Sequence, residues 1–441
     1  MNKKYYIKTF GCQMNKNDSE RVSSLLNSLG FKKTEKVEES DLIIVNTCSI
    51  RQSAEDRVFG MIKNWQKLRI HKPELVIAVT GCMPGRDKDG KLGKKIPGVD
   101  LWFGIDSLLQ LPKWLEGLGF NCHPELLEGS FKDYLEINPK RENLYQVFIS
   151  IQTGCDNFCT YCVVPHARGR ERNRTLKNIL EEIKIAVSNG AKEITLLGQV
   201  VNDYKASDKE NFSFDNPFKD HFSALLWEIN QIEGEFRIHF TAPDPQHFND
   251  EQIESLLLPK QVNFLHIPVQ SGDNNILKKM NRHYTREEYI VLIEKIRKSK
   301  PEIVIATDII VGFCDEGEEE FQNTVDMYKK CDFDISYNAK YSERTGTTAA
   351  KVLNDNVTIE DKKKRWFILQ DLMVKITLRK NQKYLDKVVR VLVDSCKGGV
   401  CSGNSDEMKI VQFVGIPEMI GTFQKIKITQ ALTWILKGKL V

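Results

Sequence analysis

The sequence lacks a hydrophobic run long enough to cross a membrane. A membrane helix needs roughly 18 consecutive apolar residues, and no stretch of the 441 residues approaches that length. The first ten residues mix Lys with aromatic side chains, so the unbroken apolar core of a secretory signal is also missing. We therefore expect a cytoplasmic protein with no membrane segment.

The composition also lacks the biases of disordered and fibrous proteins. Hydrophobic residues make up 41% of the chain and charged residues 28%, and Gly and Pro number only 27 and 14. At roughly 100–200 residues per domain, the length predicts two to four domains, each able to bury its own core.

The chain also lacks an even number of cysteines, since it has 11. Disulfides are rare in the cytoplasm. Clustered cysteines in a cytoplasmic chain more often bind metal or take part in chemistry, so their positions are the feature to follow.

The first 120 residues repeat one pattern three times: a short apolar run, a small polar step, then a cysteine. The cysteines are Cys12, Cys48 and Cys82, with spacings of 36 and 34 residues. Such spacings fit βαβ units, and residues 19–29 have the apolar periodicity of a helix that stops at Gly30. Because the carboxyl ends of parallel strands share one edge, we expect the three thiols to converge there.

The middle of the chain alternates strands and helices. Residues 121–140 lack periodicity and are predicted to form a linker. A helix is expected over 176–187, opened by Thr175 and closed by Gly190. Six strands are expected at 147–152, 193–197, 236–240, 264–268, 303–311 and 334–340. Six β/α units predict an open or partial α/β barrel with its function at the carboxyl ends of the strands.

The tail has a different pattern and most of the basic charge. After a helical stretch at 360–380, short strands are expected at 388–393, 409–414 and 423–429, with Gly398-Gly399 and Gly403-Asn404 as breaks between strands. From Arg379 to Val441 there are 11 Lys and Arg against 5 Asp and Glu, a net of +6, while the rest of the chain carries −2. We expect a small basic β-barrel.

The sharpest motif is Cys155-x3-Cys159-x2-Cys162, directly after the first strand of the expected barrel. Three thiolates can hold three irons of a [4Fe-4S] cluster, and no fourth cysteine is nearby to close it. One iron stays open to an exogenous ligand, an arrangement that suits catalysis. Two alternatives stay open: a Cys3His zinc site completed by His166, and cysteines without a metal.

These residues and several further segments resemble the radical S-adenosylmethionine (SAM) methylthiotransferase family over nearly the whole chain. The resembling segments are Thr9–Asn15, Val45–Cys48, Thr80–Cys82, Val163–Pro165, Arg168–Arg170, Leu196–Gln199, His266–Gly272 and Asp308–Phe313.

The resemblance implies two [4Fe-4S] clusters and SAM as cofactors. Cys155, Cys159 and Cys162 would hold the radical cluster, at which SAM is split, and these are the expected catalytic residues. Cys12, Cys48 and Cys82 would hold an auxiliary cluster that carries the sulfur. Gln270 and Ser271 are expected to contact SAM, and His266 to have a hydrogen-bonded structural role. The remaining cysteines, with no such context, are expected to be free thiols: Cys122, Cys314, Cys331, Cys396 and Cys401.

The resemblance also implies the domain plan and the fold class, which is α/β. Residues 1–120 would form an amino-terminal parallel-sheet domain with the auxiliary cluster, 121–140 a linker, 141–377 a partial (β/α)6 radical SAM barrel, and 378–441 a small OB-like RNA-binding β-barrel called TRAM.

Three substrates occur in the family. One branch modifies a dimethylallyl-adenosine next to the tRNA anticodon, a second the threonylcarbamoyl form of that adenosine, and a third an aspartate of a ribosomal protein. Segments 9–15, 162–165 and 268–272 are most similar to the first branch. A zinc-dependent RNA-binding protein that is not an enzyme remains the rival from another class.

Partners follow from the same resemblance. They would be the anticodon loop of tRNA, an electron donor such as flavodoxin or ferredoxin, and iron-sulfur assembly or carrier proteins, with the chain itself a monomer. The stretch Arg168, Arg170, Arg172 and Arg174 is either a solvated charge run or a contact to RNA phosphate or a substrate carboxylate.

Two departures from the family pattern concern the pocket. Residues 312–317 read Gly-Phe-Cys-Asp-Glu-Gly where members usually have Gly-Phe-Pro-Gly-Glu-Thr, and His166 stands where tyrosine is usual. The loop after the fifth barrel strand is therefore expected to differ in shape.

Overall fold

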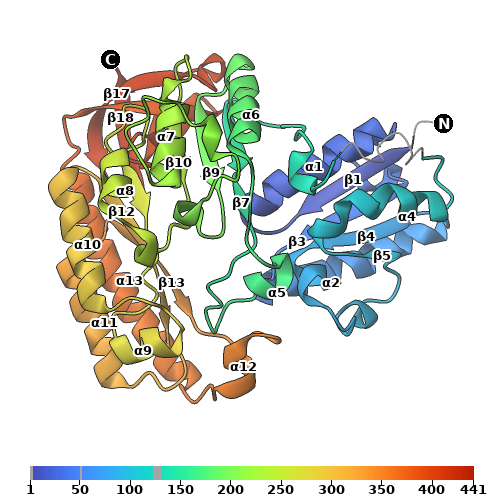
Figure 1. Ribbon diagram of the computed structural model, residues 1–441, viewed down its shortest axis with the longest axis horizontal. Helices are drawn as coiled ribbons and strands as arrows, with labels where there is room; N and C mark the ends of the chain where they lie inside the picture. The colour runs from blue at the N-terminus through green and yellow to red at the C-terminus, as the bar shows by residue number, and fades with distance from the viewer. Residues whose placement is uncertain (1–2, 50–51, 123–130) are drawn as a thin grey trace.

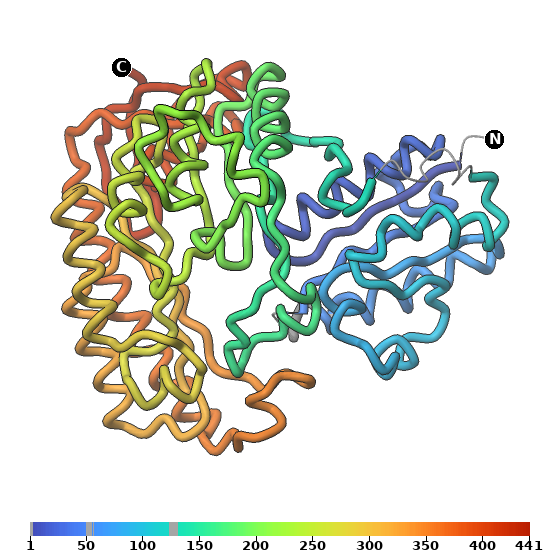
Figure 2. Tube along the Cα trace, in the orientation of Figure 1, coloured from blue at the N-terminus to red at the C-terminus, as the bar shows by residue number. Residues whose placement is uncertain are grey.

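The computed structural model describes residues 3–49, 52–122 and 131–441. Three units follow one another along the chain: an amino-terminal sheet, a central pair of parallel sheets, and a carboxyl-terminal barrel. The first described residues and the carboxyl terminus lie on opposite sides of the molecule (Figure 2). Within the described ranges, no helix has the length and apolar content that a membrane crossing requires.

The amino-terminal unit is a five-stranded parallel sheet in the order β2-β1-β3-β4-β5. Its two central strands are fully buried, which fits their unbroken apolar runs. The strands are β1 Lys4–Thr9, β2 Lys32–Lys33, β3 Leu42–Thr47, β4 Val76–Gly81 and β5 Leu101–Trp102; the helices are α1 Gln13–Ser28, α2 Gln52–Gln66, α3 Cys82–Arg86 and α4 Leu111–Gly117. The expected βαβ units and parallel sheet are confirmed.

Helix α1 begins at Gln13, six residues before the start expected from periodicity. Its first turns are polar yet buried, with Asn15, Asn17 and Asp18 each 0% exposed. These side chains serve hydrogen bonds rather than an apolar core, so the hydrophobic pattern does not show the beginning of the helix.

The expected linker at 121–140 lies partly outside the described residues, which resume at Phe131. The part that is described packs closely: Tyr134, Leu135 and Ile137 are buried in the apolar core of the amino-terminal unit. A short 3-10 turn, Tyr134–Glu136, carries the first two of these side chains. This stretch therefore belongs physically to the amino-terminal unit.

The central unit contains all six expected strands. They form two parallel sheets, β10-β9-β6 and β11-β12-β13, joined by a parallel bridge between Ile238 and Gln261. The strands are β6 Gln146–Ser150, β9 Glu193–Leu197, β10 Arg237–Phe240, β11 Phe264–His266, β12 Val304–Val311 and β13 Ile335–Lys340, with a two-stranded ribbon of β7 Gln152–Thr153 and β8 Arg172–Asn173.

Helices cover the outer side of these sheets (Figure 1). Helix α6 begins after the Thr175 cap, whose side chain accepts from the Asn178 backbone N–H, and ends before Gly190, as expected. The helices are α5 Val164–Arg168, α6 Leu176–Ser188, α7 His221–Gln231, α8 Asp250–Ser255, α9 Asn274–Lys279, α10 Arg286–Ser299, α11 Glu318–Cys331, α12 Thr348–Val352 and α13 Ile359–Gln382. The partial barrel is confirmed.

The carboxyl-terminal unit is a closed barrel in the order β14-β15-β16-β18-β17. Its strands are β14 Val388–Lys397, β15 Val400–Ser405, β16 Ile410–Val414, β17 Phe423–Ala431 and β18 Leu436–Leu440. The turn at Gly398-Gly399 is confirmed by positive φ at both residues. The predicted break at Gly403-Asn404 is wrong, because β15 runs through it. There Gly403 permits close strand approach: a Cβ would lie 2.0 Å from the Leu392 carbonyl oxygen.

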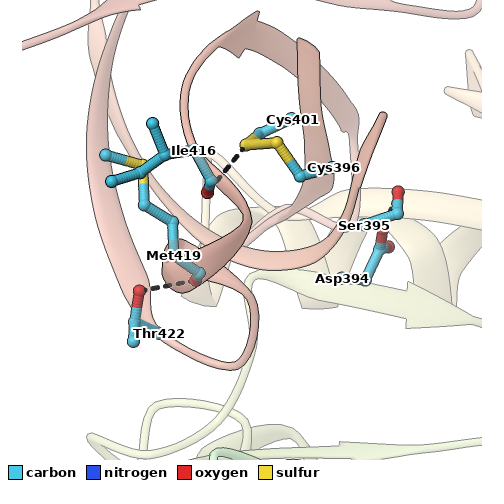
Figure 3. Close-up of a disulfide and its surroundings, with 7 residues drawn as sticks. All are labelled: Asp394, Ser395, Cys396, Cys401, Ile416, Met419 and Thr422. Atoms are coloured by element: carbon cyan, nitrogen blue, oxygen red, sulfur yellow. Dashed lines mark hydrogen bonds between the residues drawn. A yellow bond between two sulfur atoms is a disulfide. The ribbon is translucent and has the colours of Figure 1, made fainter. Parts of the chain in front are cut away.

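Two of the five cysteines expected to be free are bonded to each other. Cys396 and Cys401 form a disulfide across the β14–β15 hairpin (Figure 3). The hairpin register pairs these two residues directly, with their Cα atoms 4.0 Å apart. The expectation of a free thiol is therefore wrong at both positions, while Cys122, Cys314 and Cys331 are unbonded and buried.

Candidate functional site

The three strand-end cysteines of the amino-terminal unit lie along one edge of its sheet, as predicted. Cys12 caps α1 just after β1, Cys48 directly follows β3, and Cys82 opens α3 directly after β4. Two glycines with positive φ permit the close approach of these loops. A Cβ on Gly11 would lie 2.7 Å from the Cys48 Cβ, and one on Gly81 would lie 2.4 Å from the Thr47 carbonyl oxygen.

Buried amides hold this edge together. The Asn46 side-chain N–H donates to the Asn15 carbonyl oxygen (2.8 Å) and to Ser19 Oγ (3.0 Å). The Asn15 side-chain N–H donates to Asn46 Oδ1 (3.0 Å) and to the Thr47 carbonyl oxygen (3.1 Å). Thr47 Oγ1 donates to the Thr80 carbonyl oxygen at 2.7 Å. The polar residues beside each cysteine thus fix the loops relative to one another.

A buried ion pair lies against the same thiols. Arg168 donates to Asp18 Oδ2 at 2.6 Å, and the side chains are 1% and 0% exposed. Burial raises the pKa of the Cys82 thiol, and the Arg168 guanidinium opposes this rise, as a nearby positive charge must. Arg168 reaches this edge from α5, the helix that follows the C-x3-C-x2-C segment.

Both interpretations of the arginine stretch are wrong for its buried members. Arg168 is enclosed at the thiol edge, and Arg174 donates to Glu182 (2.6 Å) and to the Ser150 carbonyl oxygen (2.8 Å) at 8% exposure. Neither is solvated or open to RNA. Arg172 pairs with Asp106 and Asp133 at the surface. Only Arg170 is largely open, lying over the Phe158 ring at 4.9 Å.

The second thiol set occupies the loop between β7 and α5. Gly154 and Phe158 both have positive φ, which bends the loop around Cys155, Cys159 and Cys162. Burial raises the pKa of Cys155 to about 11 and that of Cys162 to about 12, and the neighbouring Cys159 adds to both rises. A metal bound there would take the thiolate forms, so its binding would release protons.

A cationic side chain that sequence reasoning missed lies at this loop. Arg282 donates from Nη1 to Cys159 Sγ at 3.3 Å and pairs with Asp244 at 3.0 Å. Asp244 also accepts from the Asn157 side chain at 2.9 Å. Arg282 stands 123 residues from Cys159. The only sequence signal for it is an arginine in the turn before the Thr285 helix cap, and that signal is weak.

Each set supplies soft sulfur ligands of the kind that iron-sulfur clusters use, with a buried arginine beside it to balance thiolate charge. Within the described residues, no three Cys, His, Asp or Glu side chains already stand close enough to coordinate one metal ion. Among these residues, neither three-cysteine set is pre-assembled, and neither is the Cys3His set with His166. The pKa of His166 is lowered by its own burial and by Lys351. The donor chemistry fits two clusters, each with three thiols.

The expected SAM contacts lie beyond β11, near the carboxyl ends of the strands. Gln270 has positive φ (69°) and bridges to Ile309 of β12, and Ser271 is 1% exposed with its hydroxyl accepting from the Asp273 backbone N–H. His266 Nε2 lies 3.1 Å from Asp308 Oδ2 but makes no hydrogen bond among the described residues, so the hydrogen-bonded structural role stays a prediction. A SAM contact by Gln270 or Ser271 stays a prediction.

Residues 312–317, which depart from the usual family pattern, are explained by how they pack. Cys314 is buried in an apolar cluster with Phe313 and Tyr341. Asp315 takes the positive φ (62°) at the residue where family members usually have glycine. Glu316 then turns inward, accepting from the Gly312 backbone N–H at 2.8 Å and from Arg365 at 3.0 Å. The buried side chains of Cys314 and Glu316 thus hold the loop in place.

A cavity of about 810 Å³ connects the three units. His239 on β10 faces it, is 7% exposed, and has an Nε2 atom with no hydrogen-bond partner among the described residues. Burial lowers the pKa of His239 to about 3, so the ring is neutral at physiological pH. The lining includes Cys12, Lys16, His239, Phe264, His266, Ile335, Tyr337, Lys409 and Trp434. Sequence reasoning missed His239, because a histidine inside a strand carries no motif.

Comparison with known protein families identifies two segments. Residues 4–104 match the family described as Uncharacterized protein family UPF0004, and residues 149–328 match the Radical SAM superfamily. These are the parts of the chain that carry the two thiol sets.

Solved structures share the fold at low sequence identity. The chain resembles the radical SAM methyltransferase TsrM from Kitasatospora setae with cobalamin and a [4Fe-4S] cluster bound. The TM-score is 0.56 at 13% identity, over 91% of this chain and 81% of that one. The TsrM structure with tryptophan substrate and a SAM analogue gives 0.53 at 13% identity, over 77% and 73%.

Curated relatives match the chain from end to end. Proteins named tRNA-2-methylthio-N(6)-dimethylallyladenosine synthase are 41% identical in Caldicellulosiruptor saccharolyticus, 42% in Shouchella clausii and 40% in Carboxydothermus hydrogenoformans. Each alignment covers 100% of this chain, and 93%, 84% and 99% of the relative. The chain therefore belongs to the radical SAM methylthiotransferase family of enzymes, in the branch of the tRNA-2-methylthio-N(6)-dimethylallyladenosine synthases.

Proposed function

We propose that this chain adds a methylthio group to carbon 2 of N(6)-dimethylallyladenosine next to the anticodon of tRNA. It would use two [4Fe-4S] clusters and two SAM per turnover. The observation that carries the proposal is the presence of two separate three-thiol sets, each beside a buried arginine, in a chain that matches synthases of this name over its full length.

The cofactors of the family are SAM and [4Fe-4S] clusters. Cys155, Cys159 and Cys162 would hold the radical cluster, and Cys12, Cys48 and Cys82 the auxiliary cluster. Gln270 and Ser271 would contact SAM. When bound, the radical cluster supplies the electron that cleaves SAM, and the auxiliary cluster supplies the sulfur.

The proposed domain plan assigns a task to each part of the chain. Residues 1–120 would carry the sulfur site, and 121–140 would connect it to the next domain, with Tyr134, Leu135 and Ile137 packed in the amino-terminal core. Residues 141–377 would form the radical SAM core, and 378–441 would bind RNA as a TRAM domain.

The protein's own residues would bind and orient the substrate. The cavity between the units offers aromatic and apolar walls for a base bearing a dimethylallyl group, and it reaches Cys12. The neutral, unpartnered His239 offers a hydrogen bond to a ring nitrogen without charge. On the carboxyl-terminal barrel, exposed lysines of neighbouring strands would contact RNA phosphates: Lys425, Lys427, Lys437 and Lys439.

Metal analysis tests the cluster part. Anaerobically reconstituted protein should hold about eight irons per chain. About four should remain after Cys12, Cys48 and Cys82 are changed to Ala, and about four after the same change at Cys155, Cys159 and Cys162. Zinc without iron, lost in His166→Ala, would instead support the zinc-dependent RNA-binding rival.

Substrate assays test the rest. The loaded enzyme is offered tRNA with dimethylallyladenosine, tRNA with threonylcarbamoyladenosine, or the ribosomal protein, each with SAM and a reductant. Methylthio product only from the first supports the proposal, and product from either of the others reassigns the substrate. We also propose flavodoxin or ferredoxin as the electron donor and iron-sulfur carriers as partners. The chain would act as a monomer in the cytoplasm.

A further inference from the structure

The ion pair Arg168–Asp18 leaves hydrogen-bonding groups unused in a buried place. One terminal nitrogen of Arg168 donates to Asp18 Oδ2. The other, Nη1, has no partner among the described residues, and neither has Asp18 Oδ1. A buried charged donor without a hydrogen-bond partner destabilises the fold, so such a group needs an explanation.

A structural tie between domains does not explain the unused donor. Arg237 is such a tie, since it joins the central sheet to the carboxyl-terminal barrel. Its Nε and Nη2 donate to Glu193, and its Nη1 donates to Asp406. All three of its nitrogens are used. Arg168 is equally buried, at 1% exposure, yet keeps one donor open.

The open donor belongs to the thiol edge. The charge of Arg168 acts on Cys82 and Cys12 as well as on Asp18. Helix α5, which ends at Arg168, packs on α3, which begins at Cys82. The packing is close: a Cβ on Gly85 would lie 2.1 Å from the Ala167 carbonyl oxygen. The guanidinium is therefore held in place by backbone contact as well as by Asp18.

We propose that Arg168, oriented by Asp18, is a positioning residue of the auxiliary site, where it supplies the buried positive charge and N–H donor for an anionic sulfur group. The inference rests on the proposed function, which places that sulfur at Cys12, Cys48 and Cys82. An anionic sulfur in a water-poor place needs a counter-charge and donors, and a guanidinium provides both.

The same residue connects the two sites. Arg168 follows Cys162 by six residues, so the segment that holds the radical-cluster thiols also carries the cation of the sulfur site. A shift of α5 would change the geometry of both sites. Helix α5 therefore links the proposed sulfur site to the proposed radical site.

The test uses full-length protein in which Cys155, Cys159 and Cys162 are Ala, so that only the auxiliary cluster is expected. Four forms are compared: Arg168 unchanged, Arg168→Lys, Arg168→Met, and the double variant Asp18→Asn/Arg168→Met. The double variant removes both charges and so avoids leaving an unpaired buried aspartate, which would destabilise the fold. Iron is counted first. Inorganic sulfide binding and the midpoint potential are then followed by EPR.

We expect both Met forms to bind sulfide at least tenfold more weakly than the unchanged form. Their midpoint potential should fall by at least the tenfold equivalent, about 59 mV for one electron, while Arg168→Lys keeps most of both properties. Loaded Met forms with unchanged sulfide affinity and potential would overturn this inference alone. No iron in the unchanged form would contradict the auxiliary cluster itself, and would overturn the inference with it.

Discussion

Asn46 is a buried side chain that ties the loop of Cys48 to the helix that follows Cys12. It lies at 0% exposure between the loops of Cys12 and Cys48, and three hydrogen bonds join its amide to α1. Replacing it with Ala removes all three bonds and leaves a small void. The loops of Cys12 and Cys82 then lose their common anchor, because Gly81 packs against the Asn46 side chain.

The size of the effect follows from the bonds lost. A buried hydrogen bond contributes about 1 kcal/mol net, and more when a partner is left unsatisfied. Three bonds predict a loss of about 3 kcal/mol from a domain whose total stability is on the order of 5–15 kcal/mol. Asn46→Ala should therefore fold, unfold at lower urea, and hold iron at the radical site only.

Asn338→Ala is the matched control. Asn338 lies in another parallel strand, and neither atom of its amide has a hydrogen-bond partner in the described part of the chain. Its replacement should leave the urea midpoint and the iron content close to those of the unchanged protein. Equal urea midpoints and equal iron in Asn46→Ala and Asn338→Ala would refute the account of how the amide frame holds the site.

Three further predictions concern other parts of the chain. Arg282→Met should lower the midpoint potential of the radical cluster, measured by EPR titration with the other thiol set changed to Ala, because a positive charge beside Cys159 is lost; an unchanged potential would deny Arg282 that role. Burial raises the pKa of Glu20 from 4.5 to about 7. The folded state therefore holds a proton on Glu20 that the unfolded state has lost, and the free energy of unfolding falls as pH rises from about 4.5 to 7. Glu20→Gln should therefore gain up to about 3 kcal/mol relative to the unchanged protein between pH 5 and 8 in urea titrations, and a pH-independent difference would count against it. The Cys396–Cys401 disulfide closes a short loop, so reducing it should lower the free energy of unfolding of the barrel by about 2 kcal/mol. Thiol alkylation followed by mass spectrometry should leave both cysteines unmodified before reduction, and alkylated thiols there would contradict the bond.

The sequence predicts the fold well where hydrophobic periodicity governs it. The buried strands and the helix capped by Thr175 lie where they were expected, because apolar runs and caps are local signals. The start of α1 was missed for the opposite reason: Asn15 and Asp18 are buried as hydrogen-bonding groups. A hydrophobic pattern does not show which polar residues are buried.

The positions of the two thiol sets can be predicted from the sequence, whereas the residues around them cannot. Cysteine spacing located both thiol sets, whereas Arg282 and His239 reach the site through tertiary structure alone. For Arg168, the sequence leaves both a solvated charge run and a contact to RNA or a substrate carboxylate open, because Arg170 and Arg172 lie beside it. The Cys396–Cys401 bond had a signal that was overlooked, namely two cysteines flanking a Gly-Gly turn.

The most direct test of the central claim is nucleoside mass spectrometry of tRNA from a host that lacks its own enzyme and expresses this chain. The account predicts that dimethylallyladenosine is converted to its 2-methylthio form, and that conversion stops when Cys12 or Cys155 is replaced by Ala. Dimethylallyladenosine persisting unchanged beside soluble, iron-loaded protein would contradict the account.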